Sequence, residues 1–308
     1  MKPDGILIIG GTGFIGSALA KRLAHEHRPV HVLARHAGRQ QDRHIFMHRG
    51  SIDDAVLLRN ILPHCGTIIH AASTTTPGVS AQQPALEAMQ NILPTLRFLE
   101  VLREFKNRHL IFFSSGGTLY GNPQHVPVEE NHPLAPLSYY GAGKAAIEAF
   151  LHTFGAQGDC AISILRPSNI YGAEQPFRPG FGIIRTMLDH IMQNSQMEIW
   201  GDGEIVRDFI YIDDVLDVCL KLVDASDDSG IYNLGSDRGY SLNHVKKTIE
   251  TICQTKLDVR YRPARQIDVK NIVLNTSLLR NRFKWQPRIA LEEGIALTWA
   301  WLNTQRSS

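Results

Sequence analysis

Tyr140 and Lys144 are the two side chains of this sequence best placed to move a proton. They stand four residues apart in a stretch from about Ser138 to Phe154 that predicts a helix, so the phenol and the ammonium share one face. A free tyrosine has a pKa of about 10, and a nearby cation favours the phenolate and lowers that value. Tyr140 could then take a proton from a hydroxyl group while a bound nicotinamide takes hydride from the same carbon. The same spacing also occurs by coincidence on exposed helices, so the context of the pair decides its meaning.

That context includes a glycine-rich turn near the N-terminus, Gly10-Gly11-Thr12-Gly13-Phe14-Ile15-Gly16. It follows a predicted strand and opens a predicted helix. Gly10 permits a tight turn, Gly13 lets the backbone approach a pyrophosphate, and Gly16 allows close helix packing. The N–H groups at the start of the helix, including those of Phe14 and Ile15, then face the anion. Glycine-rich turns also occur for loop geometry alone, but this position between strand and helix indicates a dinucleotide site.

The residues after the second predicted strand affect the choice between NAD and NADP. An acidic residue at this point normally accepts both ribose hydroxyls of NAD. Here the chain reads Ala34-Arg35-His36, with no carboxylate. Arg35, together with Arg39, could instead pair with the 2′-phosphate of NADP, although a solvated basic loop is the alternative interpretation. The sequence therefore indicates an NAD(P) cofactor and favours NADP, with NAD possible.

Alternating apolar segments and helical patterns define the fold that must position these groups. The predicted strands are Gly5–Ile9, Val30–Ala34, Ile45–His48, Thr67–His70, His109–Ser114 and Ala161–Leu165. The predicted helices are Phe14–His25, one starting near Ser51-Ile52-Asp53, one from about Pro84 to Phe105, and one from about Ser138 to Phe154. Strands that are apolar throughout and separated by helices predict an α/β fold, a Rossmann-type doubly wound parallel sheet covered on both faces.

After Arg166 the pattern becomes irregular and richer in proline and glycine, which predicts a smaller, irregular α/β lobe for the substrate. Arg207 to about Leu234 reads as a strand, a helix and a strand that return to the main sheet. We therefore expect a dinucleotide-binding domain of residues 1–165 plus about 207–234, and a substrate lobe of residues 166–206 and 235–308.

Composition narrows the class of protein. A net charge of +2 gives no sign of a nucleic-acid or membrane surface. No signal peptide is visible, and nothing approaches the roughly 20 consecutive apolar residues of a membrane span. The four cysteines are far apart, so we interpret them as reduced core thiols of a cytoplasmic protein. The histidines show no metal-ligand spacing, and no metal is expected.

Several motifs in order along the chain resemble those of the extended short-chain dehydrogenases/reductases, and within them the NAD(P)-dependent nucleotide-sugar epimerase/dehydratase group, in particular UDP-glucose/galactose 4-epimerases. The resemblance covers nearly the whole chain. The motifs are GGTGFIG (10–16), HAA (70–72), FSSGGTLYG (113–121), YGAGK (140–144), LRPSNIYG (165–172), IWGDGEIVRDFIYIDDV (199–215) and RPARQID (262–268).

This resemblance implies roles for the matching residues. Ser51, Ile52, Ala71, Ala72, Asn91, Ser114 and Pro167 would line the cofactor pocket, together with the glycine turn, Tyr140 and Lys144. Asn169 would hold the diphosphate of a nucleotide-sugar, Arg207 and Arg265 would clamp its phosphates, and Asp268 would accept from the ribose. Trp200 lies where the family contacts the base. Bidentate cations suit a diphosphate, and a carboxylate suits a ribose diol. The alternative is that both arginines are surface cations and that Trp200 belongs to the core.

The sequence departs from the family pattern at two places. Gly116 stands where the family carries a Ser or Thr that assists the catalytic tyrosine, so Ser115 or Thr118 would have to substitute, or Tyr140 would act alone. The second departure is the missing acidic residue after the second strand. Ser51 likewise stands where an aspartate commonly meets adenine. Gly117-Thr118 also lacks the acidic residues that the dehydratases of the family carry, which argues against dehydration.

The resemblance implies a 4-epimerase of a UDP-hexose: oxidation at C4 gives a ketone, the sugar turns over, and hydride returns to the other face. An NADPH-dependent reductase of a 4-keto nucleotide-sugar is the alternative, favoured by Arg35. A non-catalytic, cofactor-sensing regulator is a third reading, suggested by Gly116 and opposed by the presence of both Tyr140 and Lys144. A nucleotide-sugar is the expected partner, and a homodimer the expected assembly. The sequence fixes neither the sugar nor the nucleotide.

Overall fold

The computed structural model describes residues 3–36, 42–75, 78, 83–158, 160–178, 180–225, 227–265 and 268–306. The chain divides into two compact units. Unit 1 comprises Met1–Ser114, Ser138–Arg166 and Leu216–Tyr232, and unit 2 comprises Ser115–Leu137, Pro167–Val215 and Asn233–Ser308. Both units therefore draw on segments that are far apart in the sequence.

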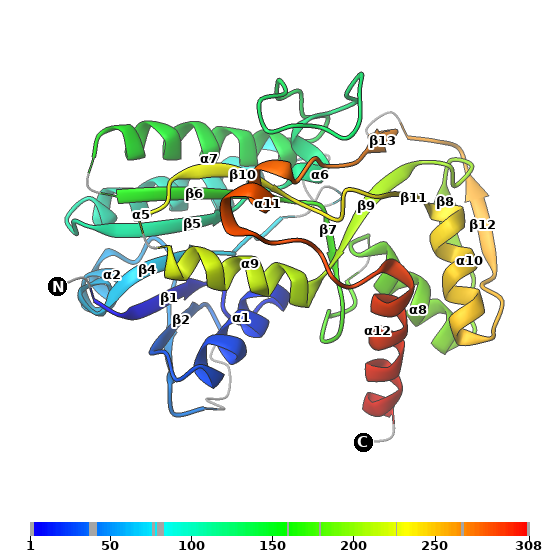
Figure 1. The fold of residues 1–308 in the computed structure, drawn as a ribbon, viewed down its shortest axis with the longest axis horizontal. Helices are drawn as coiled ribbons and strands as arrows, with labels where there is room; N and C mark the ends of the chain where they lie inside the picture. The colour runs from blue at the N-terminus through cyan, green and yellow to red at the C-terminus, as the bar shows by residue number, and fades with distance from the viewer. Residues whose placement is uncertain are drawn as a thin grey trace. The chain divides into compact units, whose positions relative to one another are not determined.

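The main sheet has seven strands in the order β10-β6-β5-β4-β1-β2-β3 (Figure 1). Its strands are β1 (Gly5–Ile9), β2 (Val30–Ala34), β3 (Ile45–Arg49), β4 (Cys65–His70), β5 (Arg108–Phe113), β6 (Cys160–Pro167) and β10 (Gly230–Leu234). The ladders from β3 through to β6 are parallel. The chain builds outward from β1 in one direction and from β4 in the other, so the strand order reverses between them. Ligands of doubly wound sheets bind beside such a reversal.

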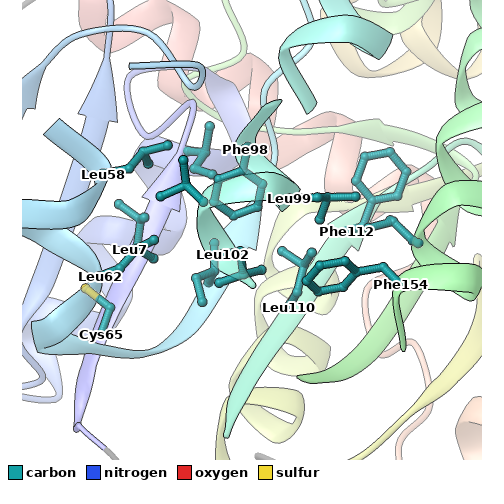
Figure 2. Packing of buried hydrophobic residues seen from close by; sticks show 14 of the residues in the cluster. Leu7, Leu58, Leu62, Cys65, Phe98, Leu99, Leu102, Leu110, Phe112 and Phe154 are labelled. Carbon is teal, nitrogen blue, oxygen red and sulfur yellow. The ribbon is translucent and has the colours of Figure 1, made fainter. Parts of the chain in front are cut away.

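Helices cover both faces of this sheet. One face packs against α2 (Ala55–Ile61), α5 (Leu93–Leu102) and α7 (Tyr139–Ala156) through one cluster of buried apolar side chains (Figure 2). On the other side, α1 (Phe14–His25) is tied to α9 (Ile212–Asp224) by an ion pair from Arg22 to Asp217 at 3.5 Å, and Arg28, in the loop after α1, pairs with Asp224 at 2.6 Å. All five residues of β1 are buried, as a central strand between two helical layers requires. The predicted Rossmann fold is confirmed.

The local predictions hold closely at the start of the chain, where β1, α1 and β2 have the expected bounds. The helix expected near Ser51 begins later, because Asp54 caps it by accepting from the N–H of Leu57 at 3.0 Å. The helix expected from about Pro84 to Phe105 is interrupted. It consists of α4 (Pro84–Glu87), a π-helical turn at Ala88–Ile92 and α5, which ends at Leu102.

Unit 2 contains two smaller sheets. In the first, β9 (Val206–Tyr211) pairs with β7 (Asn169–Tyr171), β11 (Gly239–Ser241) and β13 (Asn271–Ile272). In the second, β8 (Met197–Trp200) pairs in parallel with β12 (Val259–Arg262). Within its described residues, unit 2 also contains α6 (Gly116–Leu119), α8 (Ile183–Gln193), α10 (Leu242–Cys253), α11 (Ser277–Phe283) and α12 (Leu291–Arg306). In unit 1, a 3₁₀ turn at Leu62–His64 precedes β4.

One topological expectation was wrong. The segment from Arg207 to about Leu234 was expected to return to the main sheet with both of its strands, but β9 belongs to the sheet of unit 2 and only β10 joins the main sheet. The strand is apolar toward its end, as a main-sheet strand would be, and its partners come from β7, β11 and β13. Periodicity predicts a strand but not the sheet in which it pairs.

Candidate active site

The glycine turn of unit 1 has the geometry that a pyrophosphate requires. Gly10 has a φ of +86°, and a Cβ there would lie 2.8 Å from the backbone of Ala72. A Cβ on Gly16 would lie 2.3 Å from the carbonyl oxygen of Gly10, so the start of α1 packs directly onto the turn. Gly13 is the N-cap of α1 and supplies no side chain to it, and the space beside it is open except for Gly10 O at 3.3 Å. The first N–H groups of the helix are thus left for an anion.

Tyr140 and Lys144 lie in the first two turns of α7. Ser138 caps this helix by accepting from the N–H of Gly141 at 3.2 Å. Tyr140 is half-buried, whereas Lys144 is only 5% exposed and donates from Nζ to the carbonyl oxygen of Phe113 at 2.7 Å. The ammonium also lies 5.9 Å from the ring centre of Tyr140. The carbonyl at the end of β5 thereby fixes the lysine beside the phenol.

Burial lowers the pKa of Lys144 to about 8, against the opposing pull of the carboxylates of Glu87 and Glu148. The side chain is therefore still mostly a cation at neutral pH. A cation at this distance would favour the phenolate of Tyr140. The catalytic role of the pair remains a prediction, and the structure places the two groups close together.

The other cofactor candidates of unit 1 differ in exposure. Arg35 is exposed at the end of β2, and Arg39 lies outside the described residues. Ser51 is exposed too, and its hydroxyl donates to Asp53, which holds the pKa of that carboxyl below its usual range. Ile52, Ala71 and Ala72 are half-buried, the two alanines directly after β4.

Ser114 is buried at the end of β5, and its hydroxyl has no hydrogen-bond partner in the part of the chain that the structure describes. A buried hydroxyl without a partner is destabilising unless a ligand completes it. This hydroxyl and the open space beside Gly13 are features that a bound dinucleotide would satisfy, so the residues present fit the cofactor that the sequence implies.

The side chain of Asn91 is fully used by the protein itself. Its Oδ1 accepts from the backbone N–H and the hydroxyl of Thr74 at 3.0 and 3.1 Å. Its Nδ2 donates to Thr75 Oγ1 at 2.8 Å and to Glu87 Oε1 at 2.9 Å. An amide has two donor hydrogens and two acceptor lone pairs, and all four are occupied. Asn91 thus holds the segment that follows β4, and its predicted place in the cofactor pocket remains a prediction.

The candidates for the missing hydroxyl belong to unit 2. Ser115 is the N-cap residue of α6, but its side chain makes no capping hydrogen bond. Thr118 donates only weakly, at 3.5 Å, to the carbonyl oxygen of Ser115. Gly116 is buried, while a Cβ on Gly117 would meet nothing within 4 Å. The hydroxyl of Ser115 could therefore bind a ligand without breaking a capping hydrogen bond of α6.

Unit 2 brings the predicted nucleotide-sugar residues together. Asp268 accepts from Arg265 Nε and Nη2 at 2.9 and 3.0 Å, and the Arg265 guanidinium lies 5.3 Å from the ring centre of Trp200. Arg207 is half-buried; burial lowers its pKa to about 10, and the charge of Asp268 opposes that shift. Trp200 is 40% exposed, so it is not a core residue. Two cations, a carboxylate and an open aromatic face thus form one cluster.

Asn169 approaches the same strand from β7, since its Nδ2 donates to the carbonyl oxygen of Asp208 at 2.9 Å. Pro167, a predicted cofactor residue, is buried where β6 ends and begins the segment of unit 2 that contains Asn169.

Asp208 is a supporting residue that the sequence interpretation missed. It is 1% exposed and accepts from the N–H and the hydroxyl of Ser236, both at 2.8 Å, and from the N–H of Leu274 at 3.2 Å. Burial raises the pKa of Asp208 to about 6 despite these donors. The carboxylate joins β9 to two loops, and so fixes the backbone that carries Arg207. An acidic residue directly before the apolar end of a strand was the available signal.

Two further properties concern ligands other than a dinucleotide. No helix among the described residues is both long and apolar enough to cross a membrane. Across the same ranges, His, Cys, Asp and Glu side chains form no group of three that could hold a metal ion.

Solved structures of similar sequence share the whole fold. A UDP-glucose 4-epimerase from Thermotoga maritima, determined with UDP-glucose, is 29% identical and superposes with a TM-score of 0.92 over 98% of this chain and 99% of its own. A UDP-glucose 4-epimerase from Thermus thermophilus, determined with NAD, is 27% identical with a TM-score of 0.89, covering 97% and 99% of the two chains.

Curated relatives agree. A UDP-glucose 4-epimerase of Mycolicibacterium smegmatis is 29% identical over 303 residues, 95% of this chain and 96% of the relative. A dTDP-4-dehydro-6-deoxyglucose reductase of Escherichia coli is 27% identical over 306 residues, with 96% of each chain covered. Residues 6–235 match the profile of the NAD dependent epimerase/dehydratase family. The expected resemblance is confirmed: this chain belongs to the NAD-dependent epimerase/dehydratase family, and it is an NAD(P)-dependent enzyme of the extended short-chain dehydrogenase/reductase type.

Proposed function

We propose that the protein is a nucleotide-sugar 4-epimerase that acts on a UDP-hexose. The observation that carries the proposal is the buried Lys144 ammonium, fixed by Phe113 O at 2.7 Å beside the phenol of Tyr140. The full-length similarity to an epimerase determined with UDP-glucose supports the substrate class.

In the proposed reaction the bound dinucleotide would be held by the glycine turn, the buried hydroxyl of Ser114 and the Tyr140–Lys144 face of α7. Reversible oxidation of the sugar carbon is the chemistry that a nicotinamide supplies when bound. Tyr140, as phenolate, takes the proton of the C4 hydroxyl as that carbon is oxidised, and the sugar becomes a 4-ketose. When the ketone is reduced from its other face, the phenol returns the proton to the C4 oxygen, so the proton balance of a full turnover is zero.

In these reaction steps Lys144 stabilises the phenolate of Tyr140 and donates no proton of its own. The cation must stay charged while the phenol is deprotonated, which its hydrogen bond to Phe113 O favours. The carbonyl oxygen of Phe113 accepts a hydrogen bond from the ammonium in both half-reactions, so Lys144 keeps one position throughout.

The cluster of unit 2 would anchor the nucleotide diphosphate while the sugar turns over. Arg207 and Arg265 can provide charge-assisted contacts to the phosphates, Asp268 can accept from the ribose, and Trp200 has an open face for the base. An anchor on the diphosphate, rather than on the hexose, lets the hexose rotate without release of the 4-ketose, which an epimerase requires.

The direct experiment is turnover of UDP-glucose, UDP-galactose and their N-acetylamino counterparts, followed by NMR of the products. Tyr140→Phe should lower turnover about 10³-fold and retain binding of UDP, because it removes the proton-transferring hydroxyl alone. Tyr139→Phe is the matched control, since Tyr139 is the exposed neighbour on α7. Near-normal turnover by Tyr140→Phe would contradict the assignment.

A 4-ketoreductase is the second candidate function. Arg35 is an exposed cation where an acceptor for the NAD ribose is missing, and a curated relative is a reductase of a 4-keto nucleotide-sugar. NADP preference belongs to this candidate. Mass analysis of the ligand that purified protein releases would separate the two, because an epimerase retains its dinucleotide, whereas a reductase exchanges it at each turnover.

The assembly and location are also proposals. Met89, Leu93 and Phe150 are large, exposed apolar side chains on helical segments of unit 1. Exposed apolar side chains of this kind can form a contact between two copies of a chain, which supports a homodimer. All four cysteines are free thiols, which supports a cytoplasmic location. Light scattering of the purified protein would test the dimer.

A further inference from the structure

Glu87 is a buried carboxylate that carries out no step of the proposed reaction. It ends α4 and is 3% exposed. Within the described ranges its hydrogen-bond partners are neutral: Asn91 Nδ2 donates to Oε1 at 2.9 Å, and the hydroxyl of Thr75 donates to Oε2. Removing a carboxylate from water is costly unless a compensating charge is near. A cation close to Glu87 would therefore stabilise its buried charge.

The carboxylate rests on the catalytic turn of α7. A Cβ on Gly143 would lie 2.5 Å from both Cγ and Oε1 of Glu87, so the carboxylate occupies the space that any other residue at this position would fill. Gly143 is three residues after Tyr140 and directly before Lys144. Because residues three and four apart share a helical face, Glu87 lies against the face that carries the proposed base and its cation.

Glu87 belongs to a network of hydrogen bonds with the segment that follows β4. Asn91, one helical turn later, is held by four hydrogen bonds, two of them from Thr74. Thr75, which donates to Glu87, is also buried. The carboxylate therefore cannot turn away from α7 without breaking contacts on both sides.

The charged groups facing Lys144 identify which carboxylate matters. Glu148 lies one turn further along α7, but it is paired with Arg166 of β6, whose Nη2 is 2.6 Å from Glu148 Oε2, and both side chains are buried. That guanidinium offsets the charge of Glu148. His70 of β4 is buried, and burial together with the charge of Lys144 lowers its pKa to about 3, so it is neutral. Glu87 is thus the facing group with a negative charge that no cation of its own offsets among the described residues.

We propose that Glu87 is a positioning residue for the Tyr140–Lys144 pair: seated against Gly143, its buried carboxylate keeps the ammonium of Lys144 charged and in place beside the phenol. Only the expected effect of Glu87 on turnover rests on the proposed function. The electrostatic part concerns a contact within unit 1 and can be measured without substrate.

The test is a titration of Lys144 in protein labelled with ¹³C at the lysine Cε, with the signal assigned from a Lys144→Arg variant. The wild-type lysine should titrate near pH 8. Glu87→Gln keeps the shape of the side chain and removes its charge, with one acceptor oxygen replaced by an amide donor. The titration should therefore move down by about one to two pH units. The alkaline limb of the turnover profile should move with it.

Glu104→Gln is the matched control, because it removes an exposed carboxylate of unit 1 that pairs with Arg59. Its titration and pH profile should match the wild type. Gly143→Ala retains the carboxylate but displaces it, so it should shift Lys144 in the same direction by less. This second variant keeps the inference testable if Glu87→Gln does not fold.

The outcomes separate this inference from the proposed function. The inference would be overturned if the titration of Lys144 were unshifted in folded Glu87→Gln or, should that variant not fold, in Gly143→Ala. A lower melting temperature with an unchanged pH profile would assign Glu87 a structural role alone. A shifted titration in an enzyme that epimerises no UDP-hexose would support the electrostatic role of Glu87 and reject the proposed function. Recovery of the wild-type titration by Glu87→Asp would identify the charge as the cause.

Discussion

Truncation of the two arginines of unit 2 should affect nucleotide binding unequally. Arg207 is half-buried, and burial lowers the pKa of its guanidinium. Arg265 is exposed and already bidentate with Asp268. A phosphate that reaches Arg207 gains a half-buried charge partner, whereas one that reaches Arg265 competes with an existing pair and with solvent.

The magnitudes follow from these environments. Loss of a desolvated charge partner weakens binding by about 2–5 kcal/mol, and we expect Arg207→Ala in the middle of that range, about 3–4 kcal/mol, or roughly 150- to 900-fold in Kd. A charge-assisted hydrogen bond at an exposed site contributes about 1.5–3 kcal/mol. We expect Arg265→Ala at the lower end, about 1.5–2 kcal/mol, or roughly 10- to 30-fold.

Titration calorimetry with UDP measures both effects, and the same titration with UMP separates the β-phosphate. Arg262→Ala is the control, since Arg262 is an arginine of β12 that pairs with Glu198 rather than with Asp268. It should change the Kd for UDP by less than about twofold, as a surface pair does. Equal losses for Arg207→Ala and Arg265→Ala would refute the argument from burial, and unchanged affinity in both would place the diphosphate elsewhere.

Three further predictions concern the catalytic hydroxyl, the cofactor and acid stability. Ser115→Ala should slow turnover about 10²-fold in initial-rate assays, as the loss of a catalytic hydrogen bond does; a neutral result with a faster Gly116→Ser would show that the natural site works without this hydroxyl. NADP should bind roughly 10- to 150-fold tighter than NAD in competition with stripped protein, and Ala34→Asp combined with Arg35→Ala should invert that preference; tightly retained NAD would contradict it. Burial, with two neighbouring imidazoles, lowers the pKa of His31 to about 4, so between pH 6.5 and 4 the unfolded chain binds a proton that the folded chain does not, and stability falls as the pH falls. His31→Gln should reduce this decline by about 1 kcal/mol, discounted for partial exposure of the ring, and an unchanged pH dependence of the melting temperature would count against it.

The sequence predicted those features of the fold that depend on neighbours in the chain. The strand β1, the glycine turn and α1 follow from an apolar run, three glycines and a helical period within 25 residues. The Tyr140–Lys144 pair follows from a spacing of four on one helix. In each of these cases the interacting groups are close in sequence, so their residue types carry the information.

Long-range contacts were not accessible in this way. The place of β9 in the sheet of unit 2 depends on strands from three other segments. The four hydrogen bonds of Asn91 depend on where the chain goes after β4, and the role of Asp208 depends on Ser236 and Leu274. A buried polar residue is visible in a sequence only as an exception to the pattern around it. Its partners become known from the tertiary structure.

The candidate site residues of the two units differ in how closely they are packed. Unit 1 contains the phosphate turn and the Tyr140–Lys144 pair, where a Cβ on Gly10 or Gly16 would collide with backbone and where Lys144 is almost fully buried. Such positions tolerate few substitutions. We therefore expect their residues, and the reaction that depends on them, to be shared among members of the family. The predicted nucleotide-sugar residues of unit 2 include the exposed Arg265 and the 40% exposed Trp200, which can change without a collision in the core. The nucleotide and sugar that this enzyme prefers should therefore be decided in unit 2, and measured affinities of unit 2 variants for different nucleotide diphosphates are the data from which the substrate can be identified.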